Sequence, residues 1–235
     1  MTPAEDARLR AQVIDTCREL PRRSLTRGTS GNVSVRRDAV SFFISPTGMD
    51  YAGLEPADIP LVSQDGRWYG RSRPSSEWRF HRDILAVRPE IGSIVHAHPV
   101  HATALACTGR GIPAFHYMVA VAGGADIRCA PYRTFGSQGL SDAALEALVD
   151  RRACLLANHG LIALGATAAA ALKLAEEVET LAAQYCAALA LGKVRILDAQ
   201  EMARVIEKFR TYGRQDAADA GLTHGGEALP AGTVG

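Results

Sequence analysis

Residues 91–99 read IGSIVHAHP, and residues 154–165 read CLLANHGLIALG. The first stretch is rich in β-branched residues and stops at Pro99, and the second is an apolar run interrupted by a His-Gly turn. Short apolar runs of this kind predict buried strands. Segments with helical periodicity lie before, between and after them. The alternation predicts an α/β layer fold.

Helices are expected where apolar residues recur at helical spacing. The first is marked by a capping box, in which Thr2 and Glu5 bracket the first turn and Pro3 takes the first helical position. The longest carries an apolar stripe that we expect to face the core or a subunit interface. The predicted helices cover residues 3–21, 75–87, 101–107, 167–191 and 200–209.

The length of 235 residues, with 47% of them hydrophobic, predicts a single domain with a substantial core. We place this domain at residues 1–213. Residues 214–235 are rich in Ala and Gly and poor in large apolar side chains. That composition predicts a disordered carboxy-terminal tail.

Charge and cysteine usage exclude several classes of protein. Lys and Arg number 26 against 25 Asp and Glu, so no global field favours nucleic acid. No apolar stretch reaches the roughly 18 to 20 residues that cross a bilayer, and the first residues do not resemble a signal peptide. The five cysteines are scattered without C-x-x-C spacing, which argues against a disulfide framework or a thiolate zinc site. We expect a cytoplasmic protein that binds neither nucleic acid nor membrane.

Three histidines predict a metal site. His96 and His98 are two residues apart in a predicted strand, so their side chains leave the same face. On its own such a pair is more often two polar side chains on the wet face of a sheet. His159, however, ends another predicted strand, and α/β sheets usually place their sites at strand ends. Three imidazoles suit zinc, or manganese or cobalt, and leave a coordination position open for a substrate.

Eight stretches together resemble the class II aldolase/adducin family over about residues 9–213: GTSGNVSVR, ISPTGMDY, PSSEWRFH, VHAHPVHATAL, IPAFHYM, CAPYRTFG, ANHGLIAL and EKFRTYG. They occur in the family's order with similar spacing, which is far more specific than one motif. The resemblance implies a three-layer α/β/α sandwich with a central, largely antiparallel sheet. It also implies a homotetramer with active sites at subunit boundaries.

The resemblance assigns roles residue by residue. It makes His96, His98 and His159 the metal ligands, and makes Glu77 both the acid/base group and a fourth ligand in the resting state. Tyr117 matches a tyrosine that reaches the aldehyde end of the site from a neighbouring subunit. The residues implied to bind the phosphorylated sugar are Gly31, Asn32, Thr47, Gly48, Ser75 and Ser76 at the phosphate, with Phe135 and Tyr212 at the aldehyde end.

The activity implied is reversible cleavage of a ketose 1-phosphate, L-fuculose 1-phosphate or a related 5-deoxy-pentulose 1-phosphate, to dihydroxyacetone phosphate and an aldehyde. Ala97 and Asn158 depart from the family pattern beside the ligands and leave the preferred ketose open. A sugar-phosphate 4-epimerase, a methylthioribulose-1-phosphate dehydratase and a non-enzymatic, adducin-like scaffold are the alternatives. Glu77 favours the aldolase over the epimerase, and the three histidines with Glu77 favour it over the scaffold. Only product analysis separates it from the dehydratase.

Overall fold

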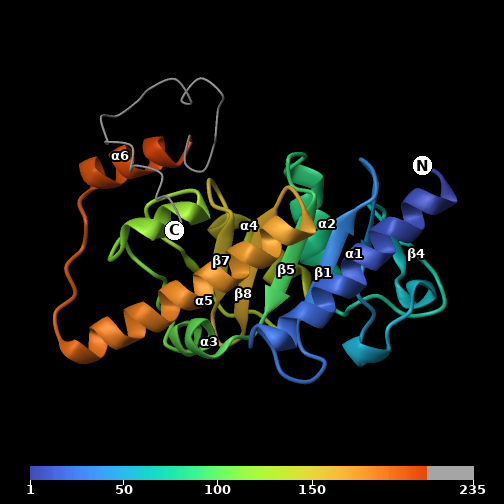
Figure 1. Cartoon of the computed structure of the whole chain (residues 1–235), viewed down its shortest axis with the longest axis horizontal. Helices are drawn as coiled ribbons and strands as arrows, with labels where there is room; N and C mark the ends of the chain where they lie inside the picture. Colours follow the sequence, from blue (N-terminus) through green and yellow to red (C-terminus); the bar gives the residue numbers. More distant parts are fainter. Residues whose placement is uncertain (211–235) are drawn as a thin grey trace, which may run out of the picture.

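The computed structural model describes residues 1–210, so the predicted tail at residues 214–235 lies outside the described part. An eight-stranded sheet forms the centre, in the order β4-β3-β2-β1-β5-β8-β7-β6 (Figure 1). Every neighbouring pair is antiparallel except β6 and β7. The strands are β1 (Asn32–Arg36), β2 (Ser41–Ile44), β3 (Leu61–Ser63), β4 (Trp68–Tyr69), β5 (Ser93–Ala97), β6 (Cys129–Ala130), β7 (Ala153–Leu156) and β8 (Gly160–Gly165).

Helices cover both faces of the sheet. The core on one face is formed with α1, α3 and α5, and the core on the other with α2 and α4. The three-layer α/β/α sandwich with a largely antiparallel sheet is therefore confirmed. The helices are α1 (Pro3–Arg22), α2 (Trp78–Val87), α3 (Val100–Cys107), α4 (Gln138–Ala147), α5 (Ala168–Leu191) and α6 (Ala199–Phe209), with short 3-10 turns η1 (Tyr51–Gly53), η2 (Pro56–Asp58) and η3 (Tyr117–Ala122).

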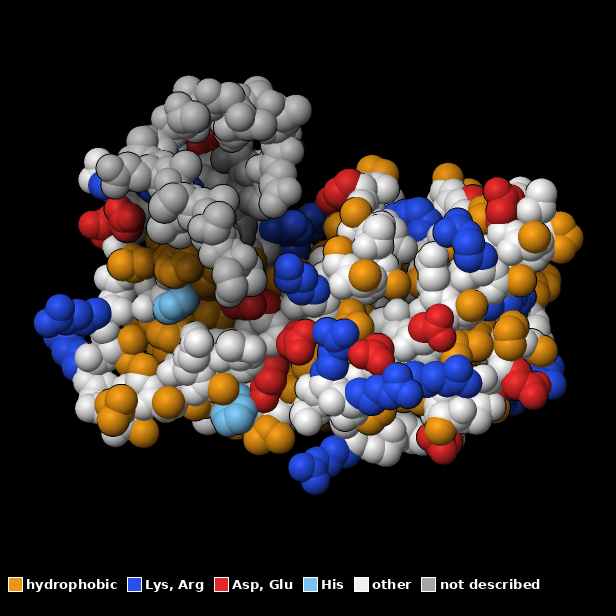
Figure 2. Space-filling view, in the orientation of Figure 1, with side chains coloured by type: hydrophobic (Ala, Val, Ile, Leu, Met, Phe, Trp, Pro, Cys, Tyr) orange, Lys and Arg blue, Asp and Glu red, His pale blue; other side chains and the backbone are white. Residues whose placement is uncertain are grey.

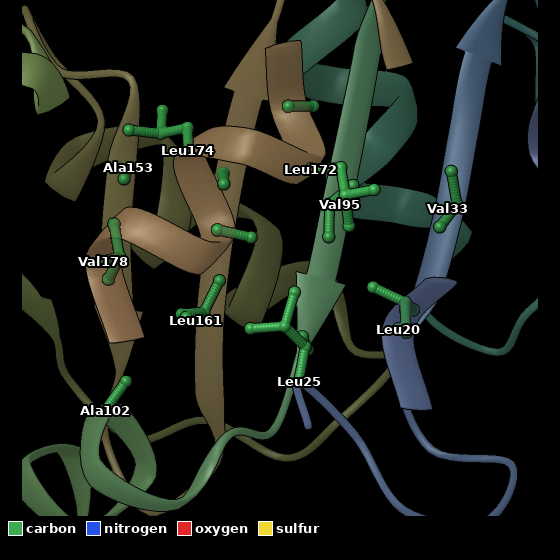
Figure 3. Close-up of a cluster of buried hydrophobic side chains, with 14 of the residues drawn as sticks. Leu20, Leu25, Val33, Val95, Ala102, Ala153, Leu161, Leu172, Leu174 and Val178 are labelled. Atoms are coloured by element: carbon green, nitrogen blue, oxygen red, sulfur yellow. The ribbon is translucent and has the colours of Figure 1, made fainter. Parts of the chain in front are cut away.

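Alternation along the strands sorts side chains between the two cores. Val33 and Val95 point to the α5 side, where Figure 3 shows them with Leu161, Leu172 and Val178 in one apolar cluster. The residues that alternate with these valines along β1 and β5 point to the α2 side. Because β1 and β5 are neighbours, this side receives polar residues from both strands at the same level.

Most helices lie where the sequence predicts them, with three differences. The helix predicted at residues 75–87 begins only at Trp78, because the Ser75 amide donates to the Ser45 carbonyl and Pro74 pairs with Pro46. Pro21 lies inside the last turn of α1 instead of ending it. The sequence analysis missed α4 and the short strands β3, β4 and β6.

Within residues 1–210, no helix combines the length and apolar content that crossing a bilayer requires.

Candidate active site

The strand pairing brings the three predicted metal ligands together. His96 is the next-to-last residue of β5 and lies opposite Asn32 of β1 and Ile162 of β8. His98 follows immediately after the same strand, and His159 lies in the turn between β7 and β8. Gly160 next to it has no room for a side chain, because a Cβ would lie 2.4 Å from the Ala97 carbonyl oxygen. The β5 end and the β7–β8 turn are therefore in direct contact.

The imidazoles converge on one point. One ligand nitrogen from each of the three histidines lies within 4.8 Å of the others. The Nε2 atoms of His96 and His98 are 2.8 Å apart. His96 Nδ1 donates to the Leu161 carbonyl at 2.8 Å, which leaves Nε2 of the same ring directed to the cluster. A hydrogen bond of this kind fixes the ring and its tautomer, as is usual for metal-binding histidines.

Glu77 closes the cluster from α2, where it is the N-cap residue. Its Oε2 lies 3.1 Å from His96 Nε2, and its Oε1 lies 3.3 Å from His159 Nε2. Asn32 Nδ2 donates to Oε2 at 3.0 Å. Oε1 is buried and has no hydrogen-bond partner among the described residues. A buried carboxylate oxygen without a hydrogen-bond partner is costly unless a cation compensates it.

The electrostatics of the cluster favour an ionised Glu77 carboxylate and neutral imidazoles at His98 and His159. Burial alone would raise the pKa of Glu77, but His96, His159 and Asn32 outweigh it and hold that pKa well below its usual range. Burial, with the neighbouring His96, lowers the pKa of His98 to about 3 and that of His159 to about 4. Burial opposes protonation of His96 as well, but Glu77 raises its pKa. Neutral imidazoles and ionised carboxylates are the forms that bind metal ions.

The donor set therefore fits a divalent ion. Zinc binds imidazole nitrogens at about 2.0 to 2.1 Å, so nitrogens around one ion must lie within a few ångströms of each other, as these do. The unpartnered Glu77 Oε1 faces the same point. Residues His96, His98 and His159 can hold a metal ion, and the Glu77 carboxylate lies beside them.

A cavity of about 350 Å³ opens beside the cluster. Nearly all the residues that the sequence assigned to sugar phosphate binding line it, namely Gly31, Asn32, Thr47, Gly48, Ser75, Ser76 and Phe135. Glu77, His98 and His159 line it too, whereas His96 is fully buried behind them. Uncharged amides and hydroxyls thus form much of the cavity lining, together with the aromatic ring of Phe135. Such groups can bind a phosphate without a cation.

Glycine is required in this wall. Gly31 has a φ of +86°, and a Cβ there would meet the His96 carbonyl oxygen at 2.8 Å. Gly48 has a φ of +67°. These left-handed conformations favour glycine, and they allow the chain to turn its amides to a ligand.

Two predicted residues are not brought to the cavity by the described chain. Tyr117, at the start of η3, is 49% exposed and stacks on Phe209 with ring centroids 6.3 Å apart. Tyr212 lies outside the described residues. His101, at the start of α3, hydrogen-bonds Glu179 and does not line the cavity.

The structure adds residues that the sequence analysis did not single out. Arg133 and Tyr132 line the cavity beside Phe135. His81 is fully buried and hydrogen-bonds both Asn32 and Ser34. The signal was present: Asn32 and Ser34 alternate along a strand, and Glu77 and His81 are four residues apart. What was missing was the information that this strand faces that helix.

The sequence is similar to a known family model and to known proteins over most of its length. The sequence model described as "Class II Aldolase and Adducin N-terminal domain" matches residues 11–186. A "5-methylthioribulose-1-phosphate/5-deoxyribulose-1-phosphate aldolase" of Rhodospirillum rubrum is 53% identical over 90% of this chain and 95% of its own. An "L-fuculose phosphate aldolase" of Escherichia coli is 47% identical over 89% and 97%.

Solved structures share the fold. An "L-fuculose 1-phosphate aldolase" with 39% identity superposes with a TM-score of 0.83 and covers 86% of this chain and 96% of its own. An l-fuculose-1-phosphate aldolase from Thermus thermophilus, at 27% identity, superposes with a TM-score of 0.69 over 81% of this chain and 100% of its own.

Proposed function

The chain belongs to the class II aldolase/adducin family, and from that premise we propose that it cleaves a ketose 1-phosphate reversibly to dihydroxyacetone phosphate and an aldehyde, with the help of a bound zinc ion. Relatives of 53% and 47% identity are named as aldolases of such substrates and match nearly the whole described chain. The chain is accordingly a ketose 1-phosphate aldolase. The metal, the residue roles and the preferred ketose are the parts that we propose.

One observation carries the proposal: three imidazoles and one carboxylate converge at the inner end of a cavity lined by amides and hydroxyls. The imidazole set favours zinc, with manganese or cobalt as alternatives, over magnesium. A divalent ion held by these residues would supply Lewis-acid stabilisation of the negative charge that develops on the C2 oxygen when the C3–C4 bond breaks.

The chain's own groups bind the substrate and move the protons. We place the phosphate among Gly31, Thr47, Gly48, Ser75 and Ser76, whose amides and hydroxyls line the cavity. This puts the carbonyl end of the ketose against the cluster. Asn32 also lines the cavity, and its side chain donates a hydrogen bond to Glu77. It therefore connects the proposed phosphate site to the carboxylate.

Glu77 and Tyr117 are the proposed proton-transfer groups. In the cleavage direction Tyr117, as the phenolate, takes the proton of the C4 hydroxyl, the C3–C4 electron pair passes to C3, and Glu77, as the carboxylic acid, delivers a proton to C3. Condensation reverses each transfer. Glu77 is held beside His96 and His159 in the described chain, and its low pKa makes it the ionised form that accepts a proton in condensation.

Tyr117 acts from a neighbouring subunit in this proposal. Its exposure and its absence from the lining of its own chain's cavity fit such a role. Figure 2 shows hydrophobic side chains gathered on the surface in the region of η3, which a partner subunit can bury. We propose a homotetramer with active sites at subunit interfaces, and a cytoplasmic location that is consistent with five free cysteines.

We favour 5-deoxyribulose 1-phosphate and its 5-methylthio analogue over L-fuculose 1-phosphate as substrates. The relative named for the first two is 53% identical and the one named for L-fuculose phosphate is 47% identical. Phe135 supplies an apolar surface in the cavity wall, with a side chain that is largely exposed in the single chain. L-fuculose 1-phosphate also ends in a methyl group but carries a hydroxyl at C5, and the apolar surface suits the methyl or methylthio end of the 5-deoxy substrates better than that hydroxyl.

The test is a panel of these three ketose 1-phosphates with zinc-loaded protein, followed by enzymatic detection of dihydroxyacetone phosphate. We expect the product from all three, with the largest kcat/KM for the two 5-deoxy substrates. Phe135→Ala should reduce the difference in kcat/KM between the 5-deoxy substrates and L-fuculose 1-phosphate. No dihydroxyacetone phosphate from any ketose would refute the aldolase.

The rival activities give different products in the same assay. An epimerised sugar phosphate without dihydroxyacetone phosphate would indicate the 4-epimerase, and loss of water from methylthioribulose 1-phosphate would indicate the dehydratase. A protein that binds no metal and turns over nothing would be a scaffold. The retained cluster of His96, His98, His159 and Glu77 is the observation against the scaffold.

A further inference from the structure

A line of four buried polar side chains runs from β1 and α2 to the metal cluster. Ser34 Oγ lies 2.7 Å from His81 Nδ1, and His81 Nε2 lies 2.5 Å from Asn32 Oδ1. Asn32 Nδ2 then donates to Glu77 Oε2 at 3.0 Å. Ser34 and His81 are fully buried, and Asn32 is only 2% exposed. The line therefore begins deep between sheet and helix and ends on the carboxylate.

The local geometry explains how these four residues meet. Asn32 and Ser34 are two apart on β1, so both side chains point to the α2 side of the sheet. Glu77 and His81 are four apart at the start of α2, so they lie one above the other on one helix face. Two residues on one face of β1 thus lie opposite two residues on one face of α2.

Chemistry fixes the direction of every hydrogen bond in the line. The Asn32 amide nitrogen donates to Glu77 Oε2, so the Asn32 oxygen, which only accepts, faces His81. His81 Nε2 must then carry the proton, and its Nδ1 must accept from the Ser34 hydroxyl. Burial, with the nearby His96, lowers the pKa of His81 to about 3, so the ring stays neutral with a single N–H.

The arrangement restrains Asn32 in the orientation that Glu77 needs. Without the His81 N–H, the amide can rotate and present its oxygen to the carboxylate, where two acceptors repel each other. Glu77 Oε2 would then lose its one donor from the sheet, and the carboxylate would shift relative to His96 and His159. The amide nitrogen of Asn32 carries a second hydrogen, and the residue lines the cavity. Its orientation therefore bears on the substrate as well.

We propose that His81 is a positioning residue for catalysis, which holds Asn32 in the orientation that places Glu77 for proton transfer. The inference rests on the proposed aldolase function. A purely structural role for His81 would lower stability and leave kcat of the folded protein unchanged, so kcat is the measurement that separates the two.

The experiment compares two substitutions at one position in the zinc-loaded protein. His81→Leu removes the donor, whereas in His81→Gln the side-chain amide can donate to Asn32 and accept from Ser34. We expect His81→Leu to lower kcat on the order of 10- to 100-fold with bound zinc and KM little changed, as for other groups that orient a metal-site residue. His81→Gln should recover most of that loss. Ile84→Val, in the same helix and equally buried, is the control and should retain wild-type kcat.

A double-mutant cycle tests whether His81 acts through Asn32. In an Asn32→Ala background, His81→Leu should cost less than about twofold in kcat, because the amide that it orients is gone. If the double variant loses kcat by the full product of the factors for the two single variants, the proposal is wrong. So would folded His81→Leu protein with kcat within about twofold of wild type, by the same criterion.

Two further measurements keep the test decisive. If His81→Leu does not fold, Ser34→Ala takes its place, since loss of the hydroxyl releases the His81 tautomer. It should lower kcat several-fold, and an unchanged kcat would overturn the proposal. Wild-type protein is assayed alongside for dihydroxyacetone phosphate, and if it forms none the aldolase function itself has failed. Active wild type with unaffected variants defeats only the role of His81.

Discussion

The inner and outer walls of the cavity differ in how completely one chain builds them. At the inner wall, Asn32 and Glu77 are at most 7% exposed, and His96 and His81 are fully buried behind them, with hydrogen bonds to sheet and helix. At the outer wall, Tyr132 is 57% exposed and Phe135 65% exposed. The inner wall is already organised before any partner or substrate arrives.

The difference separates chemistry from recognition. Groups that must be placed within tenths of an ångström lie in packed secondary structure, where each is restrained by a neighbour. Large aromatic side chains that remain exposed are typical of surfaces completed by something else. In the proposed assembly, a neighbouring subunit that brings Tyr117 supplies that completion. Substitutions at the inner wall should therefore abolish turnover, and those at the outer wall should only alter it.

The largest effect is expected from the cluster itself. His98→Ala removes one of three imidazoles and should lower kcat/KM about 1000-fold or more, because Lewis-acid stabilisation worth several kcal/mol is lost. Metal content by atomic emission should fall with activity, while circular dichroism stays unchanged. His101→Ala is the matched control, since His101 bonds Glu179 and should leave metal and activity as in wild type. Full activity of metal-free protein would contradict the proposal.

Glu77→Gln tests the other component of the inner wall. The amide keeps the size of the side chain but cannot accept the substrate proton, so kcat should fall about 100-fold or more. Zinc should remain bound through His96, His98 and His159. The pair of results distinguishes the roles, because His98→Ala loses the ion and Glu77→Gln keeps it. A Glu77→Gln variant with wild-type kcat would remove Glu77 from the proton transfer.

Tyr117→Phe probes the outer wall and should cost about 10- to 100-fold in kcat, as for a lost proton donor. Mixing this variant with Glu77→Gln subunits gives a sharper result. If each site combines Glu77 of one chain with Tyr117 of another, random mixing in a symmetric oligomer should restore about a quarter of the sites. Activity that stays at the level of the separate variants would place both groups in the same chain.

How much of the two walls could be predicted from the sequence depends on how far apart in the chain the contacting residues lie. The three histidines were predictable because strand spacing and the His-Gly turn are local patterns. The His81–Asn32 contact was not, because it depends on which strand lies beneath α2. The start of α2 was misplaced for a similar reason, since the Ser75 amide is engaged by Ser45 from a distant part of the chain. Arg133 was quoted within a motif but has no periodicity to mark it.

His81 should also make the free energy of unfolding depend on pH in the acid range. Its pKa is about 3 in the folded chain and about 6.5 when unfolded. Between these values only the unfolded chain binds the proton, so stability is complete above about pH 6.5 and declines as pH falls toward 3, by up to about 1.4 kcal/mol per pH unit. Urea unfolding of chelator-treated protein from pH 7 to 4 should show a steeper decline for wild type than for His81→Gln.

A control separates this linkage from simple destabilisation. Ile84→Val should lower stability by a similar amount at each pH, because it removes a methyl group and no titrating group. Parallel curves for wild type and His81→Gln would mean that His81 does not resist protonation in the folded chain. That outcome would also remove the reason to assign His81 a neutral ring with a single N–H, on which the direction of its hydrogen bonds depends.

The smallest effect is expected from a charge at the outer wall. Arg133 lines the cavity, is exposed, and forms no ion pair among residues 1–210, where its guanidinium donates to the Tyr132 carbonyl. A free cation there attracts a phosphorylated substrate but is screened by solvent and salt. Arg133→Ala should therefore raise KM only about threefold at low ionic strength, with kcat unchanged, and the difference should vanish near 1 M salt. Arg133→Lys should keep the wild-type KM, and Arg110→Ala, which removes the same charge away from the cavity, should not alter it. A loss of kcat in Arg133→Ala would instead give the outer wall a part in the chemistry and erase the distinction between the two walls.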